Sequence, residues 1–182
     1  TVALHVGRIF NAVAAHLKNK KNLGIVTHVV SDWAIDLIHS GAISLDRSRY
    51  SGGLVSASYC YGSRALYEYI HRNPIFEFYP IARISNPFVA RRIKSLIGIM
   101  NVKKIDISGE SVIFHSGDNL LTGYEGKLGF AMAATISKRG KAIVALNSVD
   151  QDGQSNIVIK HNCAQQSDRK STRLNSSHTI QS

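Results

Sequence analysis

The chain lacks the features that mark several large classes of protein. Its 182 residues include only two cysteines, Cys60 and Cys163, whose unrelated spacing indicates neither a disulfide framework nor a metal knuckle. The longest apolar runs, such as residues 95–100, are far too short to span a bilayer, and no basic region precedes an apolar core at the N-terminus. We therefore expect no membrane partner and an intracellular location, cytoplasmic or mitochondrial.

Acidic residues are also scarce, because 12 Asp and Glu stand against 22 Lys and Arg and give a formal net charge of +10. Such a balance suits a polyanionic partner, since clustered cations neutralise phosphates. The cations here form short separate groups near the ends of apolar segments, where they favour helix C-termini or coat the surface. Solvated faces are the preferred interpretation, a phosphate contact to a ligand comes second, and nucleic-acid binding is least favoured. The groups are Lys18, Lys20 and Lys21; Arg91, Arg92 and Lys94; Lys103 and Lys104; and Lys138, Arg139 and Lys141.

The C-terminal segment, residues 168–182, reads DRKSTRLNSSHTIQS and has no apolar periodicity. Its first part, DRKSTRLNSSH, is what a common short-read sequencing adapter encodes when it is translated in one frame. We therefore expect residues 168–182 to be a disordered, adapter-encoded artefact that takes no part in the fold. A genuine Ser-rich tail is the alternative, and residues 161–167 stay unassigned.

The body of the chain, residues 1–160, alternates short β-rich runs with amphipathic helical stretches. This pattern predicts an α/β fold with a mostly parallel sheet flanked by helices, and the length favours one domain. We expect helices over residues 9–20, 33–39, 64–71, 86–93 and 128–136. We expect strands over residues 1–6, 25–30, 54–59, 75–79, 96–101, 104–107, 111–114, 142–146 and 156–159, with a turn at Asp152-Gly153.

His28 lies late in the expected strand over residues 25–30, just before a helix that Ser31 or Asp32 is expected to cap. Active sites of open α/β sheets gather at such strand-to-helix ends. The ordinary interpretation is a strand histidine that hydrogen-bonds to neighbouring backbone. The other histidines of the body have no metal-site spacing, so we expect no metal; they are His5, His16, His39, His71, His115 and His161.

Five segments of the chain, taken in order, resemble one known enzyme family. They read LGIVTHVVSDWAIDL (residues 23–37), GSRALYEY (62–69), IDISG (105–109), GYEGKLGF (123–130) and SKRGKAIVAL (137–146). In this arrangement residues 1–160 are similar to part of the C-terminal domain of the acetyl-CoA hydrolase/transferase family, which includes acetate and hydroxybutyrate CoA-transferases. The resemblance implies that the chain is a fragment and that its parent protein has a further, N-terminal half.

The resemblance also implies an activity, namely moving coenzyme A from an acyl thioester to a carboxylic acid or to water. In the family a glutamate attacks the thioester, forms a mixed anhydride and then carries CoA as a glutamyl thioester. Backbone N–H groups of the glycine-rich loop stabilise the developing oxyanion. By resemblance, the partners are acyl-CoA, a carboxylic acid and further copies of the chain, and no metal is used. The residues matching acyl-CoA-binding positions are Gly62, Gly123, Gly126 and Lys127.

The chain departs from the family at its polar positions, while the apolar scaffold positions largely persist. His28 stands where the family has its nucleophilic glutamate. A histidine of the family becomes Val26, a glycine becomes His5 and a proline becomes Phe10. The remaining changes are Glu125 for glycine, Lys127 for glutamine, Gly129 for aspartate, Arg92 for a polar residue and Met100 for asparagine. Selection for folding without glutamyl-CoA chemistry explains this distribution.

Three hypotheses follow from these observations. The first is a CoA-transferase-like domain that binds or acts on short-chain acyl-CoA but has lost glutamyl-CoA chemistry, as a pseudoenzyme or binding module would. The second is an active acyl-CoA thioester hydrolase in which His28 is the base or nucleophile, with Glu125 as a second catalytic candidate. The third is a basic domain that binds nucleic acid or a protein partner.

Overall fold

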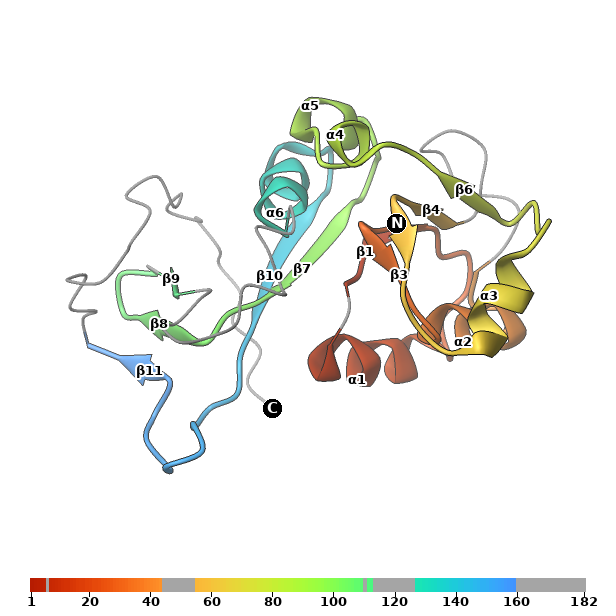
Figure 1. Cartoon of the computed structure of the whole chain (residues 1–182). Helices are drawn as coiled ribbons and strands as arrows, with labels where there is room; N and C mark the ends of the chain where they lie inside the picture. The colour runs from red at the N-terminus through yellow and green to blue at the C-terminus, as the bar shows by residue number, and fades with distance from the viewer. Residues whose placement is uncertain (6, 44–54, 110, 113–126, 160–182) are drawn as a thin grey trace. The chain divides into compact units, whose positions relative to one another are not determined.

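The computed structural model describes residues 1–5, 7–43, 55–109, 111–112 and 127–159 (Figure 1). The chain divides into two compact units. The first combines Thr1–Ile99 with Glu125–Ala142, and the second combines Met100–Tyr124 with Ile143–Ser182.

A six-stranded sheet has the strand order β10-β7-β1-β2-β4-β6. Strand β1 pairs in parallel with both β2 and β7, β2 pairs in parallel with β4, and β4 with β6. The prediction of a mostly parallel α/β sheet is thereby confirmed. The strands are β1 (Val2–Ala3), β2 (Ile25–Val26), β4 (Val55–Ala57), β6 (Phe76–Phe78), β7 (Ile97–Asn101) and β10 (Lys141–Ala145).

Two strands that the sequence predicts as continuous are each interrupted. The run over residues 25–30 divides into β2 and β3 (Val29–Val30), and the run over 54–59 divides into β4 and β5 (Tyr59–Cys60), which pairs in parallel with β3. The backbone N–H groups of Ser58 and Tyr59 both donate to the carbonyl of His28, at 3.1 and 3.0 Å. Val26 pairs with Ser56 before the interruption and Val29 with Tyr59 after it, so the ladder breaks at residues 27–28 without an inserted residue. The prediction of unbroken strands was wrong at this point.

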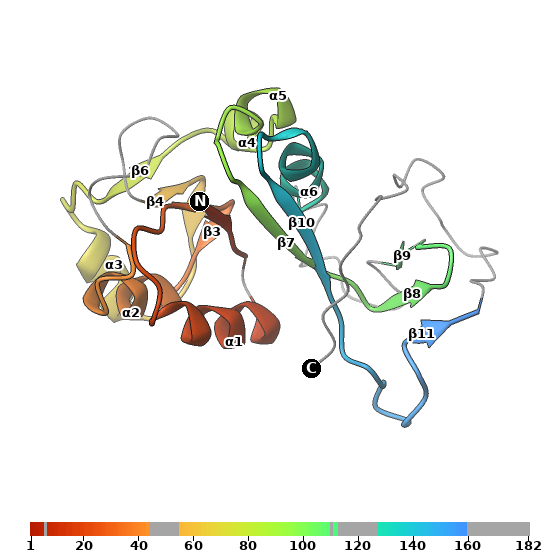
Figure 2. The ribbon, with the colours of Figure 1, turned by 180° about the vertical axis from the view of Figure 1, so that it is seen from behind.

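The six helices of the described residues follow most of the predicted positions. One helix predicted over residues 86–93 is shorter, and a helical turn that the sequence did not predict precedes it. Asn86 caps the shorter helix, since its side chain accepts a hydrogen bond from the N–H of Phe88 at 2.9 Å. Helices α1 and α2 lie side by side in both ribbon views (Figures 1 and 2). The helices are α1 (Arg8–Leu17), α2 (Trp33–His39), α3 (Arg64–Ile70), α4 (Ile81–Ile84), α5 (Pro87–Ala90) and α6 (Lys127–Ile136).

The predicted cap of α2 is confirmed in position but not in mechanism. Asp32 is the residue before the helix, yet its side chain makes no capping hydrogen bond there. Its carboxylate instead accepts the Ser63 hydroxyl at 2.6 Å and the Ser63 N–H at 3.1 and 3.2 Å. The Ser63 hydroxyl in turn accepts from Leu66 N at 3.4 Å and caps α3. Asp32 therefore joins the starts of two helices.

A buried cluster joins one face of β1 and β2 to the helices α4, α5 and α6. Ala3 of β1 and Val26 of β2 are register partners and both belong to this cluster. Successive side chains of a strand point to opposite faces, so residues two positions further on share the face of Ala3 and Val26. Those residues are His5 and His28. The other members of the cluster are Ile84, Ala90, Ile93, Leu96, Phe130, Ala133 and Ala134.

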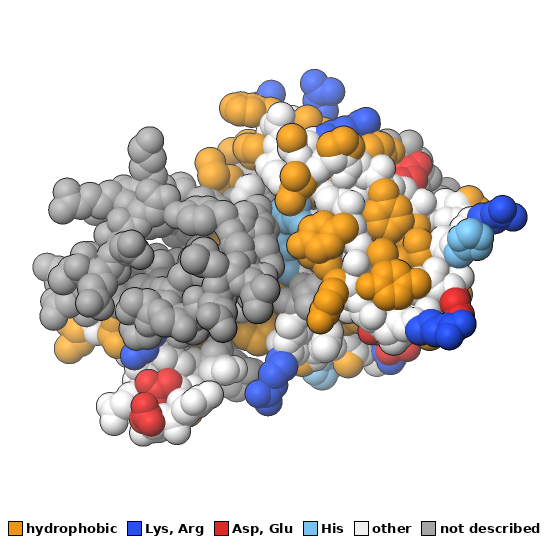
Figure 3. All heavy atoms as spheres, in the orientation of Figure 1, with side chains coloured by type: hydrophobic (Ala, Val, Ile, Leu, Met, Phe, Trp, Pro, Cys, Tyr) orange, Lys and Arg blue, Asp and Glu red, His pale blue; other side chains and the backbone are white. Residues whose placement is uncertain are grey.

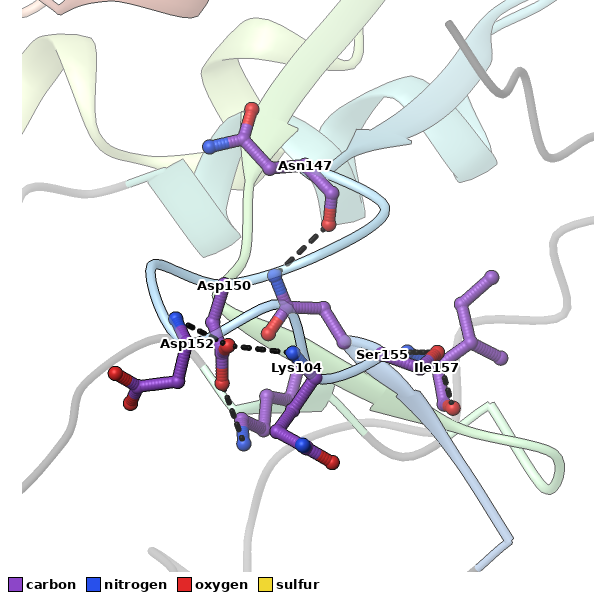
Figure 4. Close-up of polar contacts among 8 residues, drawn as sticks. Lys104, Asn147, Asp150, Asp152, Ser155 and Ile157 are labelled. Carbon is purple, nitrogen blue, oxygen red and sulfur yellow. Dashed lines mark hydrogen bonds and ion pairs between the residues drawn. The ribbon is translucent and has the colours of Figure 1, made fainter.

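In the second unit, the predicted turn at residues 152–153 is held by Asp150 (Figure 4). Its carboxylate accepts the N–H groups of Asp152 and Gln154 at 3.0 and 2.9 Å, and Lys104 Nζ lies 3.7 Å away. The backbone hydrogen bond from Gln154 is the largest influence that lowers the pKa of Asp150 below its ordinary value of 3.8. This turn leads to β11 (Ile157–Val158), which pairs with β8 (Lys104–Asp106); β8 also pairs with β9 (Ser111–Val112).

The cationic groups lie at the ends of elements, as their sequence positions predicted. Lys18 follows α1 and pairs with Asp36 at 2.8 Å, and Arg91 follows α5 with its guanidinium 5.5 Å from the Phe88 ring. On the face drawn in Figure 3, Lys and Arg side chains form small separate groups. Among the described residues, no helix is long and apolar enough to cross a membrane.

Candidate active site around His28

His28 lies in the interruption between β2 and β3, and it is fully buried at 0% exposure. Its carbonyl accepts the N–H groups of Ser58, which lies between β4 and β5, and of Tyr59 in β5. The preceding residue, Thr27, folds its hydroxyl back onto Val29, accepting from the N–H at 3.1 Å and donating to the carbonyl at 2.9 Å. This local bonding competes with the strand ladder on both sides of His28.

The imidazole of His28 has a hydroxyl partner on one side and aromatic rings on the others. Its Nε2 lies 2.8 Å from the Oγ of Ser85, the residue that ends α4. The Phe130 ring of α6 is 4.7 Å away between centroids, and the His5 ring stacks on His28 at 5.6 Å. Ser85 is half-buried, so it is the more exposed member of the pair.

Four positions at which the chain departs from the family pattern meet in this region. His5 packs edge-on against Phe10 at 5.3 Å between centroids and also contacts Phe130 at 5.8 Å. His5 stands where the resemblance places a glycine, and Phe10 stands where it places a proline, and both of those residues are smaller. Gly129 is the fourth, because a Cβ atom on it would lie 2.7 Å from the carbonyl oxygen of Ser85. The changes at His5, Phe10, His28 and Gly129 therefore form one packed cluster.

The other residues predicted for the site are placed only in part. Glu125, Gly123 and Gly126 lie outside the described residues, and Lys127 begins α6 without a described side chain. Gly62 has a packing reason of its own, because a Cβ atom there would come within 2.7 Å of Asp32 Oδ2 and 2.8 Å of Leu66 Cδ2. A contact between any of these residues and acyl-CoA stays a prediction.

Two site residues, Ser85 and Phe130, were missed by sequence reasoning. Ser85 precedes the predicted Asn86-Pro87 helix start, and nothing in its neighbourhood ties it to a residue 57 positions earlier. Phe130 falls in a predicted helix as one of several apolar residues. Among the described residues, no group of three or more His, Cys, Asp or Glu side chains is arranged to hold a metal ion. The described residues therefore present an imidazole, that of His28, hydrogen-bonded to the hydroxyl of Ser85.

Comparison with protein families supports the segment-by-segment resemblance. The model of the acetyl-CoA hydrolase/transferase C-terminal domain matches residues 62–176. The chain belongs to this family. The matched range includes part of the segment that we expect to be adapter-encoded.

Similar curated proteins are named as CoA-transferases. The 4-hydroxybutyrate coenzyme A transferase of Clostridium kluyveri is 31% identical over 154 residues, which cover 85% of this chain and 36% of that protein. The succinyl-CoA:acetate/propanoyl-CoA:succinate CoA transferase of Fasciola hepatica is 29% identical, with 87% and 34% covered. The chain thus spans about a third of the length of these relatives.

Solved structures agree with the fold. The 4-hydroxybutyrate CoA-transferase of Porphyromonas gingivalis superposes with a TM-score of 0.81 at 26% identity, covering 100% of this chain and 41% of that one. RipA from Yersinia pestis gives a TM-score of 0.78 at 26% identity, with 87% and 36% covered. The structural neighbours include CoA-transferase domains, as the resemblance implied.

Proposed function

We propose that the chain binds short-chain acyl-CoA and does not carry out glutamyl-CoA transfer. Family membership and the names of its relatives support the ligand class. The burial of His28 supports the second claim, that the chain does not carry out glutamyl-CoA transfer. The residue at the family's nucleophile position is enclosed by Phe130, His5 and Ser85, and its ring has 0% exposure.

The chemistry of the side chains supports the loss of transfer. A carboxylate can form a mixed anhydride with the acyl group and then retain CoA as a thioester of its own. An imidazole has no acyl carbon, so it cannot become a thioester of CoA. An acyl-imidazole hydrolyses readily, which favours reaction with water over transfer to a second acid. The rings of His5 and Phe10 also add bulk where the family pattern has small residues.

The test is to incubate the purified chain with acetyl-CoA, with and without propionate, and to follow both free thiol and newly formed propionyl-CoA. Binding is measured separately by calorimetric titration with CoA and acetyl-CoA. We expect binding without propionyl-CoA, and a full-length family enzyme assayed in parallel provides the positive control. Propionyl-CoA that disappears in the variant His28→Ala would contradict the proposal, as would failure to bind either ligand.

A second candidate function is hydrolysis of the acyl-CoA thioester with His28 as the base. The hydrogen bond between His28 Nε2 and Ser85 Oγ favours it, because an imidazole paired with a hydroxyl is the usual arrangement of a base and the group it activates. A fully buried ring does not meet a thioester directly. Any hydrolytic role of His28 must therefore pass through the half-buried hydroxyl beside it.

A further inference from the structure

We propose that Ser85 is the nucleophile of a thioester-hydrolysing pair in which His28 is the general base. The inference rests on the proposed binding of acyl-CoA and adds a reaction to it. The geometry of the two side chains is the starting point. The Oγ–Nε2 distance of 2.8 Å lies in the range of about 2.6–3.2 Å in which a base takes the proton of a nucleophile.

The burial of the two residues suits these different roles. A base needs a fixed orientation, and His28 has one because two backbone N–H groups hold its carbonyl while Phe130 and His5 pack on its ring. A nucleophile must reach the substrate, and Ser85 is half-buried at the end of the short helix α4. The histidine is fully buried, and the serine bonded to it is the partly exposed member of the pair.

The first turn of α6 lies close to the backbone of Ser85. Gly129 lies in the first turn of α6, and its missing side chain lets that turn approach Ser85, since a Cβ atom would be 2.7 Å from the Ser85 carbonyl oxygen. N–H groups of a helix's first turn have no partner within the helix and carry the positive end of its dipole. The aspartate that the family pattern has at this position would add both bulk and negative charge.

The reaction has two halves. In the first, the Ser85 hydroxyl gives its proton to His28 Nε2 while Oγ bonds to the thioester carbonyl carbon. The tetrahedral intermediate collapses, the C–S bond breaks, and the leaving CoA thiolate takes a proton from a water molecule outside the buried cluster. In the second, the hydroxide left by that water attacks the acyl-serine ester; collapse releases the carboxylic acid, and His28 Nε2 returns its proton to Ser85 Oγ, so the buried imidazole exchanges protons with Ser85 alone.

The test uses the full chain, acetyl-CoA labelled in its acetyl group, and rapid acid quench followed by peptide mapping in a mass spectrometer. We expect an acetyl group on Ser85 and thiol release that falls at least about 100-fold in Ser85→Ala, because general base catalysis of a nucleophile contributes on this order. Ser40→Ala is the matched control. Ser40 is also a half-buried serine that ends a helix, and its hydroxyl donates only to the Leu37 carbonyl at 3.0 Å.

The variants separate the outcomes. His28→Gln should slow acetylation of Ser85 while leaving acetyl-CoA binding intact, and Ser85→Cys, which keeps a nucleophile, should still be acylated at residue 85. Thiol release that persists in Ser85→Ala, or acetyl-CoA binding by the unmodified chain without thiol release, would overturn the inference and leave the proposed binding standing. Absence of binding in the unmodified chain would overturn the proposed function itself.

Discussion

Replacing Phe130 by alanine should destabilise the first unit more than any other single change near His28. Its side chain is 1% exposed and belongs to the buried cluster with Ala3 and Val26. Truncating a buried phenylalanine costs about 3–5 kcal/mol, from lost apolar burial and from the cavity left behind. That loss is a large part of the 5–15 kcal/mol by which domains are typically stable.

Phe88 provides the matched control for this prediction. It is 67% exposed and contacts the guanidinium of Arg91, so Phe88→Ala should cost no more than about 1 kcal/mol. The assay is urea unfolding followed by the fluorescence of Trp33, the single tryptophan, which is 5% exposed within the first unit. With a slope of about 2 kcal/mol/M, Phe130→Ala should lower the midpoint by about 2 M. Equal midpoints for the two variants would refute the packing described around His28.

Three further predictions concern other sites. His28→Glu should not produce CoA transfer between acetyl-CoA and propionate and should lower stability at neutral pH, because it places a carboxylate in an aromatic cluster; recovered transfer would contradict this. Gly98→Val should cost at least about 1 kcal/mol in urea unfolding, since its Cβ would lie 2.7 Å from the Phe130 carbonyl oxygen, and unchanged stability would count against it. The Asp150 carboxyl should titrate below 3.8 by NMR, because the Gln154 N–H favours its charged form. Its contribution to stability is therefore present above pH 3.8 and lost as the pH falls below that value, and a midpoint at or above 3.8 would contradict the hydrogen bonding of this turn.

The sheet could be predicted from the sequence because its strands are short apolar runs bounded by turn residues. The interruption at Thr27 and His28 could not, because it depends on the Thr27 hydroxyl bonding to Val29 and on two N–H groups sharing one carbonyl. Side-chain to backbone bonding of this kind leaves no periodic signal. The helix α4 was missed for a similar reason, since one turn after Pro80 is too short for an apolar repeat to appear.

The site was predicted at one residue and not at its neighbours. His28 could be singled out because the segment around it resembles the family's active-site segment, in which a nucleophilic glutamate stands at the position of His28. Its pairing with Ser85 depends on how α4 packs over β2, which the spacing of the two residues along the chain does not encode. The meeting of His5 with His28 could have been found, since Ala3 and Val26 are partners and each histidine lies two residues further on.

Carbethoxylation of histidines by diethyl pyrocarbonate, mapped by mass spectrometry, tests most directly whether the nucleophile position is closed. The imidazoles of His16, His39 and His71 belong to exposed residues and should be modified rapidly in the native protein. His28 should stay unmodified until urea unfolds the first unit. In Phe130→Ala, His28 should be modified sooner than in the unmodified chain. Modification of native His28 as fast as His39 would contradict the account, because an open imidazole could meet a thioester without Ser85.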